Sequence, residues 1–169
     1  MAKTAFYSHP ICQEHEVGPG HPEQPARLKA ILDALNAPEF AGLDRQRAPL
    51  SDIAALKEAH DADLVDLIFA NIPSTGYAAI DGDTLMTSAS GEAALRAVGA
   101  VRAAVDAVMT GVADNAFCAV RPPGHHAEPG RSMGFCLFNN VVLGAERARR
   151  EHSLDRVAVI DFDVHHGNG

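Results

Sequence analysis

Residues 161–169 hold the densest group of chemically active side chains in the sequence. They read DFDVHHGNG and follow the apolar run Val157–Ile160. In an extended segment alternate residues share one face, so Asp161, Asp163 and His165 should point together. Carboxylate and imidazole groups suit Zn²⁺, Fe²⁺ or Mn²⁺. Catalytic zinc usually takes three protein ligands, so this motif supplies two candidates and a third must come from elsewhere.

A second motif, RPPGHH at residues 121–126, follows another apolar run, Ala116–Val120. In a loop, neighbouring histidines can both line a pocket. A histidine becomes a useful base when a carboxylate fixes its tautomer and raises its basicity, and Asp161 is an available partner. We therefore expect His125 and His126 to converge on one concave site with the 163–165 pair, with Asp161 within hydrogen-bond reach of His125.

The elements between the two motifs indicate how they are positioned. The apolar runs predict strands at Ala116–Val120 and Val157–Ile160, and Asn139–Glu151 between them predicts a helix. This strand-helix-strand order is typical of a parallel sheet, and α/β folds place their sites at the carboxyl ends of parallel strands. We expect helices on both faces of the sheet. The remaining expected elements are a strand at Thr4–Tyr7, a long loop at Pro73–Ser90, and helices at Glu23–Ala37, Ser51–Leu56, Ala62–Asn71 and Glu92–Met109.

Composition narrows the function classes. With 169 residues, 47% hydrophobic and 21% charged, the sequence fits about one globular domain. A formal net charge of −8 without a basic run argues against general binding to nucleic acid or anionic membranes, although not against a cationic substrate. The three cysteines form no CxxC pair, which indicates reduced thiols. Together with the absence of a signal-peptide core, this predicts a cytoplasmic protein.

Five stretches of the sequence resemble the histone deacetylase and acetylpolyamine amidohydrolase family, most closely the bacterial relatives of class II. They are HPEQPARL at 21–28, DGDT at 81–84, RPPGHH at 121–126, GFCLFNN at 134–140 and DFDVHHGNG at 161–169. The resemblance implies a three-layer α/β/α fold of the arginase/deacetylase type with a mainly parallel sheet. It also implies a zinc-dependent amidohydrolase that removes acetyl groups from acetyl-lysine, acetylated polyamines or other small amines.

The resemblance also implies roles for the polar residues. Asp163 and His165 correspond to two zinc ligands of the family. His126 corresponds to the main general base and acid, and His125 to a chiefly electrostatic partner. Asp161 corresponds to the acid that backs His125 and helps hold a structural monovalent cation such as K⁺.

Further matches concern the second histidine and the substrate channel. Asn168 stands where class I members have an aspartate that backs the second histidine. Because an amide carries no charge, we expect that dyad to be weaker. Gly134 and Phe135 match the wall of the acyl-lysine channel, and Asp83 matches the rim acid that grips the substrate backbone. Arg27 matches a buried arginine near an internal cavity below the metal.

Other parts of the family pattern do not occur in residues 1–169. The third ligand, an aspartate, the carbonyl-polarising tyrosine or histidine and the facing channel aromatic lie downstream in the family. We therefore expect residues 1–169 to be the N-terminal part of a single deacetylase domain. Some eukaryotic class II members hold a structural zinc with N-terminal cysteines. Cys12, His15 and His21 echo that site only partly, and we interpret these histidines as ordinary loop residues.

Two alternative functions stay open. An arginase-like hydrolase with two manganese ions needs more carboxylates around the last strand, which His166 and Asn168 do not supply. A non-catalytic pseudoenzyme would present the acyl-lysine pocket without turnover. The sequence does not choose between an acetylated protein and a small acetylated amine, and it does not indicate an oligomeric state.

Overall fold

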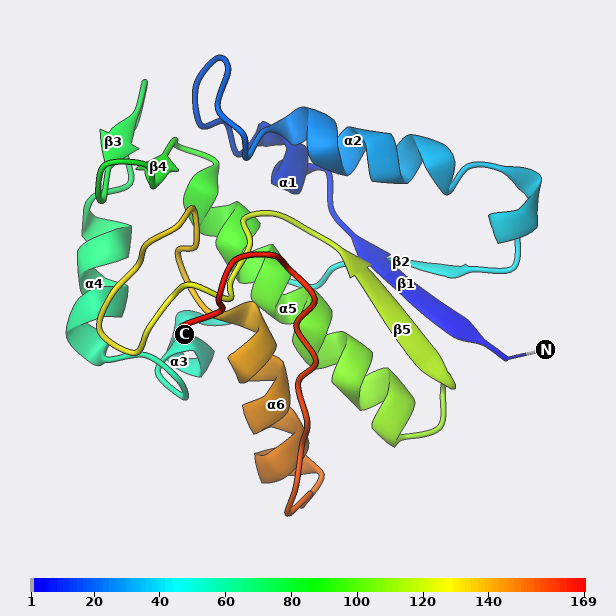
Figure 1. Ribbon diagram of the computed structural model, residues 1–169. Helices are drawn as coiled ribbons and strands as arrows, with labels where there is room; N and C mark the ends of the chain where they lie inside the picture. Colours follow the sequence, from blue (N-terminus) through cyan, green and yellow to red (C-terminus); the bar gives the residue numbers. More distant parts are fainter. Residues whose placement is uncertain (1) are drawn as a thin grey trace.

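The computed structural model describes residues 2–169, and its centre is a three-stranded parallel sheet (Figure 1). The strand order is β2 (Asp44–Arg47), β1 (Thr4–Ser8), β5 (Asn115–Ala119). In the middle strand, Ala5 lies opposite Asp44 on one side and Ala116 on the other. The carboxyl ends of all three strands therefore point to the same edge of the sheet, and β5 leads directly into the histidine loop.

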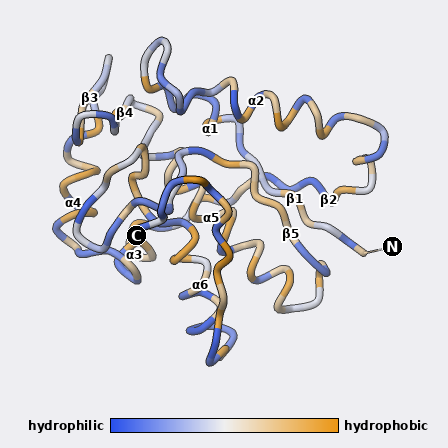
Figure 2. Tube along the Cα trace, in the orientation of Figure 1, coloured by the Kyte–Doolittle hydropathy of each residue, from blue (hydrophilic) through white to orange (hydrophobic). Residues whose placement is uncertain are grey.

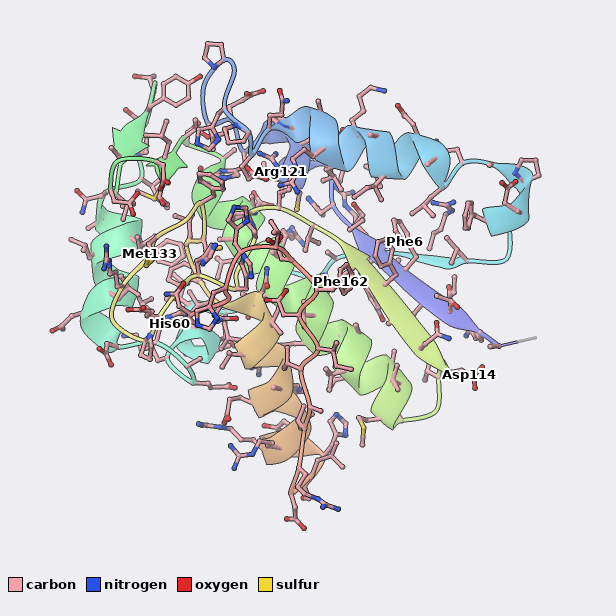
Figure 3. All side chains as sticks on the ribbon, in the orientation of Figure 1. Phe6, His60, Asp114, Arg121, Met133 and Phe162 are labelled. Carbon is pink, nitrogen blue, oxygen red and sulfur yellow. The ribbon has the colours of Figure 1, made fainter. Side chains whose placement is uncertain are left out.

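Helices cover both faces of this sheet, as predicted. On one face α5 (Ser90–Met109) packs the small side chains of Ala100 and Ala104 against Ala5 and Tyr7. On the other face, α1 (Ile11–Glu14) and α2 (Pro25–Ala34) bring apolar side chains onto Phe6, which is labelled in Figure 3. Because successive residues of a strand point to opposite faces, β1 contributes to both packed layers. The result is the three-layer α/β/α arrangement that was expected.

A third apolar cluster lies beside the sheet. It joins α5 to α3 (Ile53–Leu56), α4 (Ala62–Ala70) and α6 (Asn140–Glu151) through Leu56, Val65, Ile68, Val98 and Leu143. The expected loop at 73–90 contains a short antiparallel pair, β3 (Ala78–Ala79) and β4 (Leu85–Met86). A 3-10 helix, Pro38–Phe40, precedes β2. Within residues 2–169 no helix is long and apolar enough to cross a membrane.

The prediction of a strand at Val157–Ile160 is wrong. Residues 154–169 instead form an irregular segment that runs past α6 and returns toward the histidine loop (Figure 1). The apolar side chains of this run lie at the surface, with Val159 57% and Ile160 88% exposed, and Figure 2 shows them as an orange stretch beside α6. An apolar pattern forms a buried strand only where other atoms cover it. In the part of the chain that the structure describes, nothing covers the outer side of this run.

We expect Gly99→Ala to destabilise the fold because its new methyl group would meet the backbone carbonyl oxygen of Pro49 at 2.0 Å. Overpacking costs about 1–3 kcal/mol, against a gain of roughly 1 kcal/mol when alanine replaces glycine in a helix. The expected net loss in unfolding free energy is up to about 2 kcal/mol, measured by urea denaturation. Gly42→Ala is the matched control, since nothing lies within 4 Å of its added Cβ. Equal losses in both variants would contradict the prediction.

Candidate active site

The loop between β5 and α6 begins with a buried ion pair. The Arg121 guanidinium donates two hydrogen bonds to the Glu23 carboxylate, both 2.6 Å, and a third to the Cys12 carbonyl oxygen at 2.8 Å. Both charged side chains are almost completely buried, at 5% and 1% exposure. The geometry is the bidentate one in which arginine binds a carboxylate most strongly. It fixes the start of the histidine loop to the segment before α2.

His60 fixes the far part of the same loop. Its Nε2 accepts a hydrogen bond from the Asn139 backbone N–H at 2.8 Å, so the proton of the neutral ring is on Nδ1. Nδ1 therefore donates to the Glu128 carbonyl oxygen at 3.0 Å. Burial is the main cause that lowers the pKa of His60, which favours this neutral form. The loop that carries the paired histidines is thus held at both ends by buried side chains.

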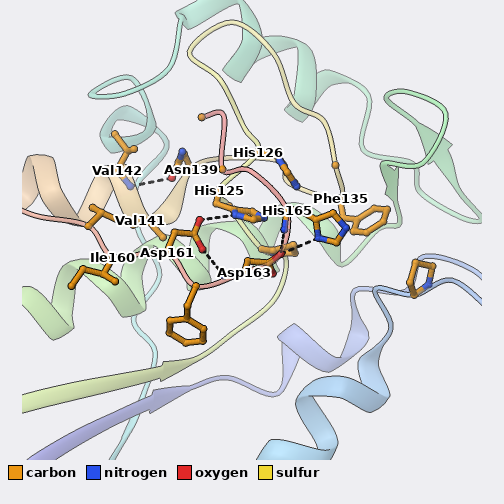
Figure 4. Close-up of a pocket in the computed structure, with 18 of the residues that line it drawn as sticks. His125, His126, Phe135, Asn139, Val141, Val142, Ile160, Asp161, Asp163 and His165 are labelled. Carbon is orange, nitrogen blue, oxygen red and sulfur yellow. Dashed lines mark hydrogen bonds and ion pairs between the residues drawn. The ribbon is translucent and has the colours of Figure 1, made fainter.

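The first histidine makes the predicted hydrogen bond. His125 Nδ1 donates to Asp161 Oδ2 at 2.8 Å, since a carboxylate can only accept (Figure 4). This bond is the main cause that lowers the pKa of Asp161. Asp161 Oδ1 accepts from the backbone N–H of Asp163, and the Gly169 N–H donates to the His125 carbonyl oxygen. Segment 161–169 is therefore attached to the histidine loop although it is not part of the sheet.

The second histidine faces Asn168. His126 Nδ1 lies 2.7 Å from Asn168 Oδ1, and the two histidine rings are 4.1 Å apart between centroids. Gly134 lies directly against the His126 ring, where an added Cβ would come within 2.5 Å of Cδ2. The glycine also has a φ of +56°, which side chains rarely adopt. Both features explain why a residue without a side chain stands beside His126.

Asp163 and His165 are the two residues that could hold a metal. His165 Nδ1 donates to Asp163 Oδ1 at 2.9 Å, and the His165 backbone N–H donates to the same oxygen. The backbone bond is the main cause that lowers the pKa of Asp163. Two ligands of one tetrahedral zinc lie roughly 3.3 Å apart, so these two donors fit one ion. Within residues 2–169, however, no group of three histidine, cysteine or acidic side chains is placed to bind a metal.

All the residues predicted for the site except Asn168 line one pocket of about 1060 Å³, and Asn168 lies behind His126. His125, His126, Asp161, Asp163 and His165 all line it, in agreement with the expectation from their spacing (Figure 4). The pocket also contains the substrate-site candidates Arg27, Asp83, Gly134 and Phe135.

The rim of the pocket is organised around His21. Its Nδ1 lies 3.1 Å from both the backbone nitrogen and the carbonyl oxygen of Glu23, and its Nε2 lies 3.1 Å from the Asp83 carbonyl oxygen. The edge of the same ring packs on Phe135, with 4.6 Å between centroids. The Phe135 N–H donates to Thr84 Oγ1 at 3.1 Å. His21, which sequence reasoning left as an ordinary loop residue, therefore joins the backbone of Asp83 to the ring of Phe135.

The expectation of a buried Arg27 is wrong. Arg27 lines the pocket, but its side chain is exposed because it lies in the first turn of α2, on a side that residues 2–169 leave open. The buried arginine is Arg121, which lies close to α1 and α2 in Figure 3. Sequence reasoning did not identify its partner Glu23. The sequence feature that could have identified Glu23 is its position inside the HPEQPARL motif.

These features define a fold of the arginase/deacetylase type with paired histidines and a carboxylate-imidazole pair at the carboxyl edge of its sheet. The histone deacetylase domain family model matches residues 21–169. The chain is 36% identical to a histone deacetylase-like amidohydrolase of Pseudomonas aeruginosa, covering 99% of this chain and 48% of that protein. It is 38% identical to the human polyamine deacetylase HDAC10, covering 87% of this chain and 23% of that protein.

Solved structures agree with these relatives. A crystal structure of the HDA15 HD domain matches with a TM-score of 0.93 at 32% identity, covering 99% of this chain and 48% of that chain. The chain therefore belongs to the histone deacetylase family. It spans about half the length, or less, of these three relatives.

Another buried histidine, His15, lies beside the ion pair. His15 is 1% exposed, its Nδ1 lies 2.7 Å from Ser90 Oγ, and its Nε2 has no hydrogen-bond partner among the described residues. Glu23 Oε2 is 4.0 Å from that Nε2. Burial, assisted by the charge of Arg121 and opposed by that of Glu23, lowers the pKa of His15 to about 4.

This pKa predicts acid sensitivity. Between pH 6.5 and 4, His15 in the unfolded chain binds a proton that His15 in the folded chain does not. Its contribution to the free energy of unfolding is therefore fully present above pH 6.5 and is lost as the pH falls toward 4. The contribution of this residue to the loss is about 3 kcal/mol at most. We therefore compare the free energies of unfolding of wild type and His15→Gln by urea denaturation. The difference between them should shrink or reverse between pH 7 and pH 4. A difference that is constant with pH would contradict the burial of a neutral His15.

Proposed function

We propose that this chain supplies the general-base residues and two zinc ligands of an amidohydrolase that removes acetyl groups from acetylated amines. The observation that carries the proposal is the pair of backed histidines in one pocket with Asp163 and His165. In each histidine Nδ1 is held by a side-chain oxygen of segment 161–169. This arrangement leaves Nε2 of the neutral ring as the proton acceptor.

Asp163 and His165 would hold the zinc ion, together with the aspartate expected from the downstream part of the family pattern. When bound there, zinc polarises an amide carbonyl and lowers the pKa of a water molecule to about 7. A structural potassium ion beside Asp161 belongs to the same proposal. The arginase-like alternative is less well supported, because His166 and Asn168 stand where it would need additional carboxylates.

His126 would take the proton of the attacking water at Nε2 and return it to the leaving amine. A positioned acid-base group of this kind contributes about 10²–10⁴ to a rate. His125, whose Nδ1 proton is bound by the Asp161 carboxylate, would stabilise negative charge that develops beside it. The two rings are 4.1 Å apart between centroids, so both effects would act at the same end of the pocket.

The pocket wall suggests the shape of the substrate. Gly134 and Phe135 would pack on the apolar stem of an acetyl-lysine or an acetylated polyamine, and Arg27 lines the same pocket. Asp83, exposed at the rim, would accept a hydrogen bond from a peptide N–H or bind a polyamine nitrogen. The net charge of −8 is consistent with a cationic substrate.

We expect the 169-residue chain by itself to hydrolyse a fluorogenic acetyl-lysine peptide barely above background. Two ligands hold a metal poorly, and losing one oxyanion-stabilising group typically costs about 10²–10³ in rate. The assay compares zinc-loaded chain with a longer chain that includes the downstream part of the domain, which should bind zinc and turn over. If the 169-residue chain shows strong zinc-dependent turnover that Asp163→Ala does not reduce, the ligand assignment is wrong.

In that longer chain, His126→Ala and Asp163→Ala should differ in a specific way. His126→Ala should lower kcat by about 10²–10⁴ and retain zinc, because it removes only the acid-base group. Asp163→Ala should lose both zinc and activity. Zinc content by atomic absorption and kcat on the same samples separate the two effects. Asp33→Ala, an exposed carboxylate on α2, is the matched control and should change neither quantity.

A further inference from the structure

Glu128 lies on the opposite side of Asn168 from His126. Asn168 Nδ2 donates to Glu128 Oε1 at 2.6 Å, while Asn168 Oδ1 lies 2.7 Å from His126 Nδ1. Nδ2 is also 3.3 Å from the His126 carbonyl oxygen. The three side chains therefore form a continuous row in the order carboxylate, amide, imidazole.

Two acceptors determine which way the amide points: the Glu128 carboxylate at 2.6 Å and, at the longer distance of 3.3 Å, the His126 carbonyl oxygen. The two ends of an asparagine amide are nearly identical in shape, so only its hydrogen-bond partners fix its orientation. Glu128 can only accept, so the amide must present its NH₂ group to it. The amide oxygen is then left for His126, and the histidine must donate to it from Nδ1. His126 Nε2 is thereby the unprotonated nitrogen, as general-base catalysis requires.

The backbone of Glu128 is held in place by contacts that do not involve Asn168. Its carbonyl oxygen accepts from the buried His60, and its backbone N–H donates to the Arg131 carbonyl oxygen at 2.9 Å. The side chain is half-buried, so the charge at its tip is only partly screened by water. A charged acceptor on one side of an amide also strengthens the amide oxygen as an acceptor on the other side.

We propose that Glu128 is a positioning residue for His126, which acts through the Asn168 amide to hold the imidazole as its Nδ1–H tautomer. The expectation that an uncharged Asn168 weakens the second dyad is thereby modified, since a carboxylate stands directly behind the amide. The inference depends on the proposed role of His126. Its test reads the protonation of the ring itself, without metal or substrate, so failure of the proposed deacetylation would leave the result unaffected.

The test uses ¹⁵N spectra of histidine-labelled chain at about pH 8, above the ordinary histidine pKa. His126→Gln identifies the His126 signals by their loss. In the wild type, Nδ1 should carry the proton. In Glu128→Ala the ratio of the Nδ1–H to the Nε2–H tautomer should fall at least roughly threefold. Glu146→Ala, an acidic residue on α6, is the matched control and should leave the ratio unchanged.

A double-mutant cycle shows whether the effect passes through the amide. In Asn168→Asp, the new carboxylate accepts from His126 without help and is repelled by Glu128. Adding Glu128→Ala to Asn168→Asp should therefore leave the tautomer ratio unchanged or raise it. The proposal is overturned if Glu128→Ala has no effect on the wild-type chain, or if it lowers the ratio equally in both backgrounds. Backbone amide signals of α5 verify that each variant is folded.

Discussion

The buried pair of Arg121 and Glu23 is the interaction on which the site depends. Its residues are 98 positions apart in the sequence, and the pair joins the segment before α2 to the first residue of the histidine loop. Two buried charges gain little net stability together, but leaving either one unpaired typically costs about 3–5 kcal/mol. The pair therefore acts mainly as a constraint: the loop has one position in which both charges are satisfied. The loop then carries His125 and His126 to the carboxyl edge of the sheet.

Around this constraint, the site is built from contacts between two segments that are not paired as strands. The loop after β5 contributes the imidazoles, and residues 161–169 contribute the oxygens that hold them. Asp161 and Asn168 each hold one histidine, while the Gly169 N–H and the His125 carbonyl oxygen join the two backbones. The geometry of the paired histidines is thus set mainly by side-chain hydrogen bonds, and the sheet determines only where their loop begins.

Periodicity and local motifs predicted a large part of this architecture. The apolar run at 116–120 identified β5, and the alternation of Asp161, Asp163 and His165 correctly predicted a shared pocket with the paired histidines. Val157–Ile160 was predicted wrongly because an apolar pattern reports a tendency to be buried and not the presence of covering atoms.

Pairings across long sequence separations were not predictable. Glu23 with Arg121, and Glu128 with Asn168, involve ordinary polar residues whose partners are brought near only by the fold. The exposure of Arg27 was missed for the same reason, since burial depends on which elements pack over a helix turn.

The attachment of segment 161–169 to the histidine loop has a consequence for the apolar run before it. Side chains of an extended chain alternate between faces, so a shift by one residue would turn Asp161 away from His125 and reverse every neighbouring side chain. The hydrogen bonds at 161 and 168 exclude such a shift. They fix which side chains of segment 161–169 face the histidine loop, and the apolar run at 157–160 therefore enters that segment in one register, as a tight turn fixes the register of a hairpin.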